Sequence, residues 1–359
     1  MEIVFCILLC VLLYCIIPQR ITLLAIFSTG LVMACGAYFL SEYHQYDLIY
    51  YRELYSTLQE GGIQSVFVYS AVERSPGFIW LVYFLTYFAD NRLVSAIPTF
   101  FGVVTIGFIT KKMTHKNGKK KFIGVLIMLI FFFLYPWHAL PAAIRNPLAH
   151  IFCLIALYWD LETNKFRKAL PLYIFAIFIH QSSIIFIFLR ILLYLYTRGS
   201  LKKTIVLSIC LFLGSFSEII GPILDFFVEL TGIHILDSVS HSFNSYTTKQ
   251  DGLYEYGIVI VNVVAILLIY FSSRIYFRRQ DKKDSSSMTF YTMLMLVTIG
   301  YIWQYDILCR FSNACVILSP LVLCRCNYMK LLPLVMFSTF NLVYYYLIYY
   351  SKFEIIFPF

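Results

Sequence analysis

The sequence predicts an all-α, polytopic integral membrane protein. Of its 359 residues, 60% are hydrophobic and only 13% are charged, about half the charged share of a typical soluble domain. The apolar residues gather in long runs that are separated by short polar or basic loops. Since about 20 apolar residues can cross a bilayer as a helix, we expect about 12 to 13 hydrophobic segments. They would form a single transmembrane domain over residues 1–359.

The segments are bounded by proline, glycine and charged residues. In chain order they are 3–17, 21–40, 77–89, 93–109, 122–134, 142–159, 169–179, 184–196, 204–221, 256–271, 288–305, 311–323 and 331–350. Residues 41–76 are amphipathic instead and carry several charges. An interfacial helix is predicted there from the helical spacing of its apolar positions, which are Leu48, Tyr51, Leu54, Tyr55 and Leu58.

Basic residues orient the chain, because Lys and Arg accumulate in cytoplasmic loops. They cluster at position 20 and at 111–121, 165–168, 198–203, 274–283 and 325–330. This pattern leaves loops 41–76 and 221–254, and both termini, on the extracytoplasmic side. If runs 77–89 and 93–109 both spanned the membrane, the lysine-rich loop after them would fall outside. We therefore expect one of these two runs to be re-entrant or interfacial.

Several classes of function find no support in the sequence. It contains no Walker A motif, no glycine-rich nucleotide fingerprint and no H-E-x-x-H. The net charge of +9 is explained by the cytoplasmic loops, so no nucleic-acid partner is expected. Cys324 and Cys326 have no nearby His or further Cys, so we expect no metal, and nothing indicates a cofactor. Any chemistry must therefore use a lipid-linked substrate reached from the outer side.

Polar residues from distant parts of the chain converge on the outer face in this topology. They are Asp47, Glu73, Arg74, His138, Arg145, His180, Asp306 and Arg310. Ionisable residues at membrane depth are costly, and they count by default as candidates for a functional site. Arg145 is predicted one turn inside its helix. His180 is predicted at the far end of the next helix, which would put both at the same face.

Each candidate has a functional and a structural interpretation. A guanidinium near a helix N-terminus suits a phosphate oxygen, whereas the alternative for Arg145 is a side chain that only snorkels to the interface. His180 is a candidate general base, or an interfacial histidine bonded to Ser183. Asp47 is a second candidate base, or the N-cap of the interfacial helix.

The remaining candidates would contact substrate. Glu73 and Arg74 either close the site over a sugar or form a surface ion pair of little energy. Arg310 either helps to neutralise a diphosphate or pairs with Asp306. His138 either stacks on a sugar ring or belongs to an aromatic belt at the membrane interface.

Three short motifs resemble the EpsG family, whose members are Wzy-like bacterial exopolysaccharide polymerases. The first is R-N-x-L-A at Arg145, followed by a polar hinge and by A-x-F-x-H-x-S, which contains His180 and Ser182. Asn146 departs from the family pattern, where Gln is expected. The other motifs are D-x-x-Y-Y, at Asp47, Tyr50 and Tyr51, and a late helix that starts at Arg310.

The resemblance implies a fold related to GT-C glycosyltransferases and a specific reaction. Undecaprenyl-pyrophosphate-linked oligosaccharide repeat units would be joined into exo- or capsular polysaccharide at the outer face of the bacterial cytoplasmic membrane. Arg145 and Arg310 would hold the pyrophosphate leaving group, and His180 or Asp47 would take the proton of the acceptor hydroxyl. Tyr50, Tyr51 and Ser182 match the motifs and would bind substrate.

The expected partners are the lipid-linked glycan, membrane lipid, a flippase and a chain-length regulator. Two other functions stay open. A flippase or transporter of lipid-linked glycans would also need the arginines but no base. A membrane O-acyltransferase that modifies the polysaccharide would use His180 as base and would need an acyl donor from the cytoplasmic face.

Overall fold

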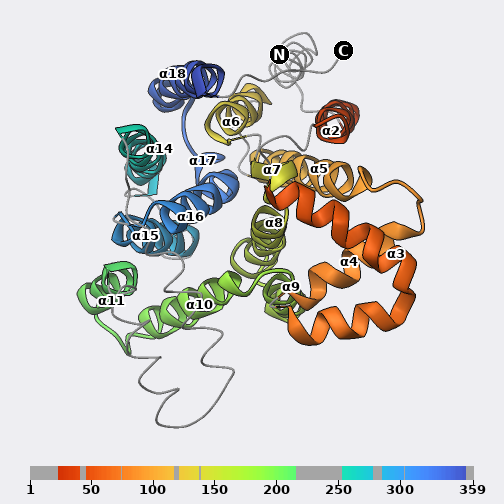
Figure 1. The fold of residues 1–359 in the computed structure, drawn as a ribbon. Helices are drawn as coiled ribbons and strands as arrows, with labels where there is room; N and C mark the ends of the chain where they lie inside the picture. The colour runs from red at the N-terminus through yellow and green to blue at the C-terminus, as the bar shows by residue number, and fades with distance from the viewer. Residues whose placement is uncertain are drawn as a thin grey trace. The chain divides into compact units, whose positions relative to one another are not determined.

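The computed structural model is built of α-helices (Figure 1). It describes residues 23–40, 46–73, 75–116, 121–136, 139–215, 253–277, 285–302 and 304–352. Within these ranges most residues are helical and none forms a strand, so the all-α prediction is confirmed. The predicted segment 3–17 and nearly all of the predicted loop 221–254 lie outside the described residues.

The described helices follow one another with short connections. They are α2 (Leu23–Tyr38), α3 (Tyr46–Val72), α4 (Pro76–Thr86), α5 (Leu93–Lys116), α6 (Lys121–Leu134), α7 (Ala139–Ala142), α8 (Arg145–Leu157), the π-helix η1 (Tyr158–Glu162), α9 (Phe166–Ile179), the 3-10 helix η2 (Gln181–Ser183), α10 (Ile184–Thr197), α11 (Lys203–Ser215), α14 (Leu253–Phe277), α15 (Ser285–Gly300), α16 (Tyr305–Leu318), α17 (Pro320–Leu323) and α18 (Tyr328–Lys352).

The helices carry the apolar surface of a membrane protein. In the described ranges, three stretches are long and apolar enough to cross a bilayer, namely Leu93–Lys116, Gly257–Arg274 and Tyr305–Leu323. Shorter apolar helices of 10–17 residues accompany them. Together with the composition, these helices identify an integral membrane protein, as predicted from the sequence.

The chain divides into two compact units, and each is described by itself. The first unit contains residues 1–187 and 317–359, and the second contains residues 188–316. In the second unit α15 packs against α11 and α14, and the rings of Tyr301 and Phe311 stack with centroids 5.6 Å apart. The first unit contains the pairs α2 with α5, α3 with α4, α8 with α9, and α6 with α18.

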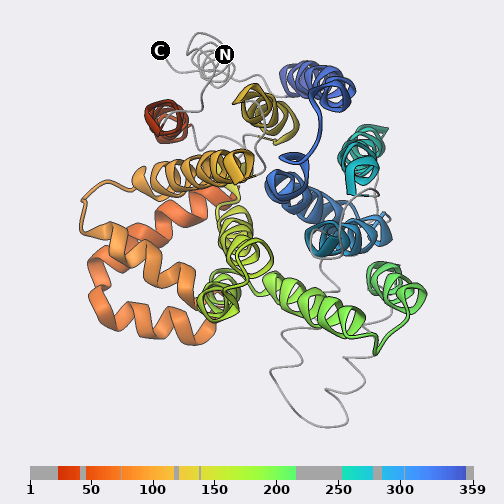
Figure 2. The same cartoon turned by 180° about the vertical axis from the view of Figure 1, so that it is seen from behind.

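The predicted interfacial helix exists as α3, but it is not straight. Its predicted apolar positions are all buried, namely Leu48, Tyr51, Leu54, Tyr55 and Leu58. Gly62 adopts φ 59° and ψ −155°, a conformation that is essentially open only to glycine. This corner divides α3 into two arms beside α4, as both ribbon views show (Figure 1, Figure 2).

Of the two apolar runs between residues 77 and 109, only the second is long enough to span. The 11 residues of α4 reach about 17 Å and the 24 residues of α5 about 36 Å at 1.5 Å per residue. The hydrocarbon core is about 30 Å thick. The lengths agree with the expectation that one of the two runs does not cross the membrane.

α8 and α9 form an antiparallel pair whose connection is shorter than the predicted polar hinge 160–168. The π-helical turn η1 extends α8 as far as Glu162, and α9 begins at Phe166. Asn164 reverses the chain with φ 55°, a left-handed conformation that Asn tolerates better than most residues.

The two faces of α9 differ in the way that a membrane helix requires. Every fourth residue on one face is an exposed apolar side chain, namely Phe166, Leu170, Ile174 and Phe178. The opposite face buries smaller residues and one tyrosine, namely Ala169, Ala176, Ile179 and Tyr173. The spacing of four residues keeps each set on one side of the helix.

Candidate functional site

Arg145 is the first residue of α8, so the prediction that it lies one turn inside the helix is wrong. The physical reason is Pro147, since proline favours the first turn of a helix and the helix therefore begins close to it. Ile144, just before the arginine, is fully buried in an apolar cluster with residues of α3 and α4. This anchor fixes the start of α8 against α3.

The Arg145 guanidinium lies against two tyrosines of α3. Its Nε donates to the Tyr51 hydroxyl at 3.0 Å. The guanidinium carbon is 5.4 Å from the Tyr51 ring centroid and 6.0 Å from that of Tyr50. The Tyr51 ring is itself held edge-on by Phe78 of α4, with centroids 4.9 Å apart. The cation is thus positioned by aromatic groups that are packed in the core.

Glu73 lies on the other side of the same guanidinium. Arg145 Nη1 and Glu73 Oε2 are 3.9 Å apart, too far for a hydrogen bond, so charge alone holds the pair. The Tyr50 hydroxyl donates to Glu73 Oε1 at 2.6 Å. Burial, together with this bond to a carboxylate, raises the pKa of Tyr50, which keeps the phenol a donor. The Arg145 and Glu73 side chains remain 26% and 30% exposed.

The corner at Gly62 makes this cluster possible. Tyr50 and Glu73 are 23 positions apart, and a straight helix would separate them by about 35 Å. Asp47 is exposed in the first turn of α3, and its charge also acts on Arg145. Because α3 begins at Tyr46, Asp47 lies inside the helix rather than at the N-cap, where a carboxylate still favours the helix dipole.

His180 ends α9 in an extended conformation, with φ −155° and ψ 121°. Its ring Nδ1 is 2.7 Å from the Ser182 hydroxyl and accepts the Ser182 backbone N–H at 3.2 Å. The predicted structural partner was Ser183, but that residue contributes its backbone N–H to the His180 carbonyl at 3.0 Å. The side chain of His180 therefore bonds to Ser182.

A short polar bridge connects the histidine to the start of α8. The Ser182 hydroxyl is 3.3 Å from Asn146 Oδ1, and Asn146 directly follows Arg145. Ile179 packs with Leu148 and Ala149 of α8 immediately beside this bridge. The prediction that Arg145 and His180 lie at the same end of the helix pair therefore agrees with the structure.

A glycine allows α4 to reach this end of the helix pair. A Cβ atom at Gly77 would lie 2.9 Å from the backbone carbonyl carbon of Phe178, closer than real contacts allow. The backbone of α4 thus approaches the last turn of α9, two residues before His180, only because position 77 has no side chain.

The structure does not bring every predicted residue into this cluster. Arg310 is half-buried on α16 in the second unit, together with Asp306 in the first turn of the same helix. Arg74 and His138 lie outside the described residues. The cluster that we define as the tyrosine–arginine site therefore consists of Asp47, Tyr50, Tyr51, Glu73 and Arg145, and the His180 bridge consists of His180, Ser182 and Asn146.

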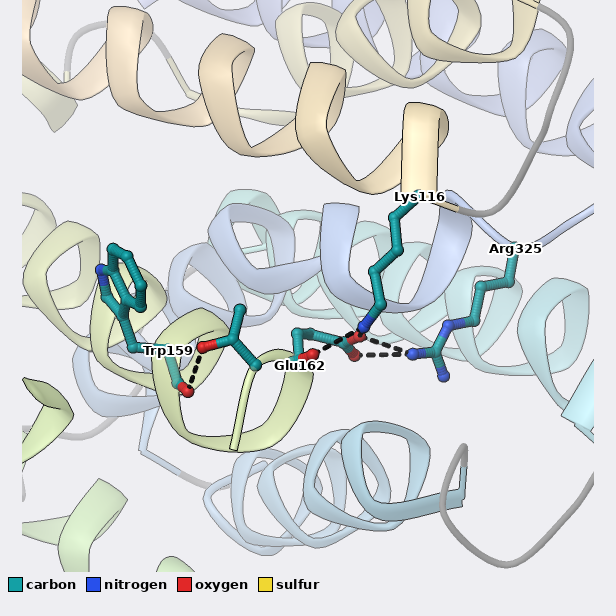
Figure 3. Close-up of polar contacts among 5 residues, drawn as sticks. Lys116, Trp159, Glu162 and Arg325 are labelled. Carbon is teal, nitrogen blue, oxygen red and sulfur yellow. Dashed lines mark hydrogen bonds and ion pairs between the residues drawn. The ribbon is translucent and has the colours of Figure 1, made fainter. Parts of the chain in front are cut away.

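A second charged cluster lies at the opposite end of the α8–η1 stretch (Figure 3). Arg325 Nη2 contacts both carboxylate oxygens of Glu162, at 2.8 and 2.7 Å. Lys116 Nζ bonds to the same carboxylate at 3.0 Å and to the Glu162 carbonyl at 2.6 Å. The Arg325 and Glu162 side chains are only 3% and 1% exposed. We call these three residues the glutamate clamp.

The sequence gave no reason to connect these three residues. Lys116 and Arg325 were attributed to cytoplasmic loops by the charge rule, and Glu162 was part of the predicted hinge. Glu162 and Arg325 are 163 positions apart, so no local spacing indicates the pair. The usable signal was the acidic residue itself, within a segment whose other charged neighbours are mainly basic.

The tyrosine–arginine site can bind an anion and can accept a proton. Arg145 offers a cation at a helix N-terminus, which suits phosphate oxygens. Asp47 and Glu73 offer carboxylates within the same small region. Among the described residues, no group of three or more His, Cys, Asp or Glu side chains is arranged to hold a metal ion.

Comparison with known proteins gives one match. A protein-family model described as the EpsG family matches residues 23–359, nearly the whole chain. No curated protein and no solved structure matches the sequence or the fold.

Proposed function

Because the chain belongs to the EpsG family, which indicates a role like that of a polysaccharide polymerase, we propose that it joins lipid-linked oligosaccharide repeat units. The substrate would be an oligosaccharide on undecaprenyl pyrophosphate, and the product an exo- or capsular polysaccharide. The reaction would take place at the outer face of the bacterial cytoplasmic membrane. The observation that supports it most is the meeting of Arg145 with Tyr50, Tyr51 and Glu73, three groups from distant parts of α3 and its end.

Arg145 would bind the pyrophosphate of the donor. Its ion pair with Glu73 is long and partly exposed, so a diphosphate oxygen can replace the carboxylate without stripping a buried charge. The two tyrosine rings would keep the guanidinium in place during this exchange. Arg310 is proposed as a second cation for the same diphosphate, because one positive charge neutralises a diphosphate poorly.

The transfer itself needs a leaving group and a proton acceptor. The acceptor hydroxyl oxygen would form a new bond to the anomeric carbon of the donor, while the bond from that carbon to the pyrophosphate breaks. The electron pair of the broken bond goes to the pyrophosphate, where the arginines stabilise the charge. The hydroxyl proton goes to His180 or Asp47, the two candidate bases of the site.

The other predicted residues would contact the sugars. Tyr50, Tyr51 and Ser182 are proposed to bind substrate beside Arg145 and His180. Glu73 and Arg74 would close the site over a sugar, and His138 would stack on one. A flippase that delivers the lipid-linked units and a regulator of chain length are the proposed partners.

The test uses purified protein and undecaprenyl-pyrophosphate-linked repeat units in detergent or liposomes. We expect a ladder of lipid-linked products that contain two or more repeat units. In cells, deletion of the gene should leave single repeat units on the lipid. Movement of the lipid across the bilayer without a ladder would support a flippase instead, and loss of even single units in the deletion strain would contradict both roles.

A further inference from the structure

The ring of His180 is oriented by a group that can only donate a hydrogen bond. The Ser182 backbone N–H points at Nδ1 from 3.2 Å. A backbone amide has one proton and no means of accepting, so Nδ1 must present a lone pair. A neutral imidazole has one N–H, and with Nδ1 acting as acceptor that proton is on Nε2.

The Ser182 hydroxyl strengthens this assignment. It lies 2.7 Å from Nδ1, the shorter of its two contacts, and 3.3 Å from Asn146 Oδ1. A hydroxyl at this distance from an unprotonated ring nitrogen donates to it. Nδ1 then accepts two hydrogen bonds from one residue, and a proton on Nδ1 would break both.

From this geometry, and resting on the polymerase function proposed above, we propose that His180 is a hydrogen-bond donor to substrate and not the base. Its Nε2–H would donate to an oxygen of the donor pyrophosphate, near the cation of Arg145. Ser182 and Asn146 are positioning residues, because they act on the substrate only through the orientation and tautomer of His180.

The proton acceptor is then a carboxylate. The other candidate base, Asp47, is exposed in the first turn of α3, and its charge already acts on Arg145. A proton moves from the acceptor hydroxyl to a carboxylate oxygen of Asp47, while the pyrophosphate leaves with the electron pair of the broken bond. The histidine keeps its own proton throughout this step and stabilises the charge on the leaving group.

Two substitutions of the same histidine distinguish a donor from a base. The amide nitrogen of His180→Gln can take the place of Nε2–H, whereas His180→Ala has no donor. We expect His180→Ala to lower the rate of polymerisation by about 100-fold to 1,000-fold, the range for loss of one donor to a developing oxyanion. His180→Gln should stay within about tenfold of wild type, the value of one weakened hydrogen bond. His115→Gln, at an exposed position near the end of α5, is the matched control and should have no effect.

The tautomer can be measured without any activity assay. The full-length protein is labelled with ¹⁵N-histidine in detergent, and the His180 signals are identified as those missing from the His180→Gln spectrum. We expect an unprotonated Nδ1 and a protonated Nε2 near neutral pH. Ser182→Ala should weaken the Nδ1 hydrogen-bond shift and lower the rate by about tenfold, and Ser182→Thr, which keeps the hydroxyl, should restore both.

Two results would overturn the donor role. One is equal loss of activity in His180→Gln and His180→Ala while His115→Gln stays active. The other is a proton on Nδ1 in the wild-type spectrum. Failure of wild-type protein to form any ladder would instead contradict the polymerase function, and the tautomer measurement would then still decide the assignment of His180.

Discussion

Two arginine–glutamate pairs of the first unit lie at opposite ends of the α8–η1 stretch, about 25 Å apart at 1.5 Å per residue. The pair of Arg145 and Glu73 is 3.9 Å long and its side chains are about a quarter to a third exposed. The pair of Arg325 and Glu162 is 2.7 Å long and almost fully buried. The same two residue types thus form an open contact at one end and a closed contact at the other.

The difference in burial decides what each pair can do. Exposed ion pairs contribute only about 0–1 kcal/mol, so little is lost when a ligand replaces one partner. A buried pair has already lost its hydration, and removal of one partner leaves an uncompensated charge that costs about 3–5 kcal/mol. The open pair is therefore suited to binding and the closed pair to holding α5, η1 and the turn after α17 together.

The largest expected effect is on stability, at the closed end. Glu162→Gln should destabilise the protein by about 3–5 kcal/mol, because a buried guanidinium and Lys116 would then face a neutral amide. Thermal unfolding in detergent and the amount of protein in the membrane would measure it. The double variant Glu162→Leu with Arg325→Met removes both charges and should be more stable than Glu162→Gln. Equal instability of the two variants would contradict this account of the clamp.

The second effect is on activity, at the open end. Arg145→Ala should reduce polymer formation by about 1,000-fold, and Arg145→Lys by about 100-fold, because a point charge replaces a planar fork. The thermal midpoint should change little in both variants, since the guanidinium is partly exposed. Polymer yield per unit of membrane protein is the measurement. A large loss of folded protein in Arg145→Lys would mean that the open pair is also structural.

The third effect concerns the corner that forms the open end. Gly62→Ala should cost about 1–3 kcal/mol, because alanine does not adopt the positive φ of this position without strain. No neighbouring atom lies within 4 Å of a Cβ there, so the cost comes from the backbone alone. Activity should fall together with stability, since Tyr50 and Glu73 meet through this corner. Gln59→Ala, at an exposed position on the same helix, is the control and should be neutral within about 0.5 kcal/mol.

The smallest effect is expected from the open carboxylate. Glu73→Gln should change the free energy of unfolding by less than about 1 kcal/mol, since the ion pair is long and partly exposed. An amide at this position can still accept the Tyr50 hydrogen bond. Chemical unfolding of the two proteins side by side would measure the difference. A loss as large as that of Glu162→Gln would remove the contrast between the two ends.

The sequence predicted the open end better than the closed end, for physical reasons. The apolar stripe of α3 has helical period, and its five positions are buried as expected. Topology alone put Arg145, Glu73 and His180 at one face. The corner at Gly62 was not predicted, because a glycine within a helical pattern usually only weakens the helix. The clamp was not predicted either, because its pairing of Glu162 with Arg325 depends on the full tertiary fold.

Binding of a polyprenyl pyrophosphate tests the contrast between the two ends most directly. Ligand at about 100 times its dissociation constant should stabilise wild-type protein by about 2.7 kcal/mol, measured as a rise in thermal midpoint in detergent. We predict that Arg145→Ala abolishes this rise, while the double variant Glu162→Leu with Arg325→Met keeps it. A rise that persists in Arg145→Ala, or one that is lost only in the clamp variant, would contradict the assignment of the open end as the binding site.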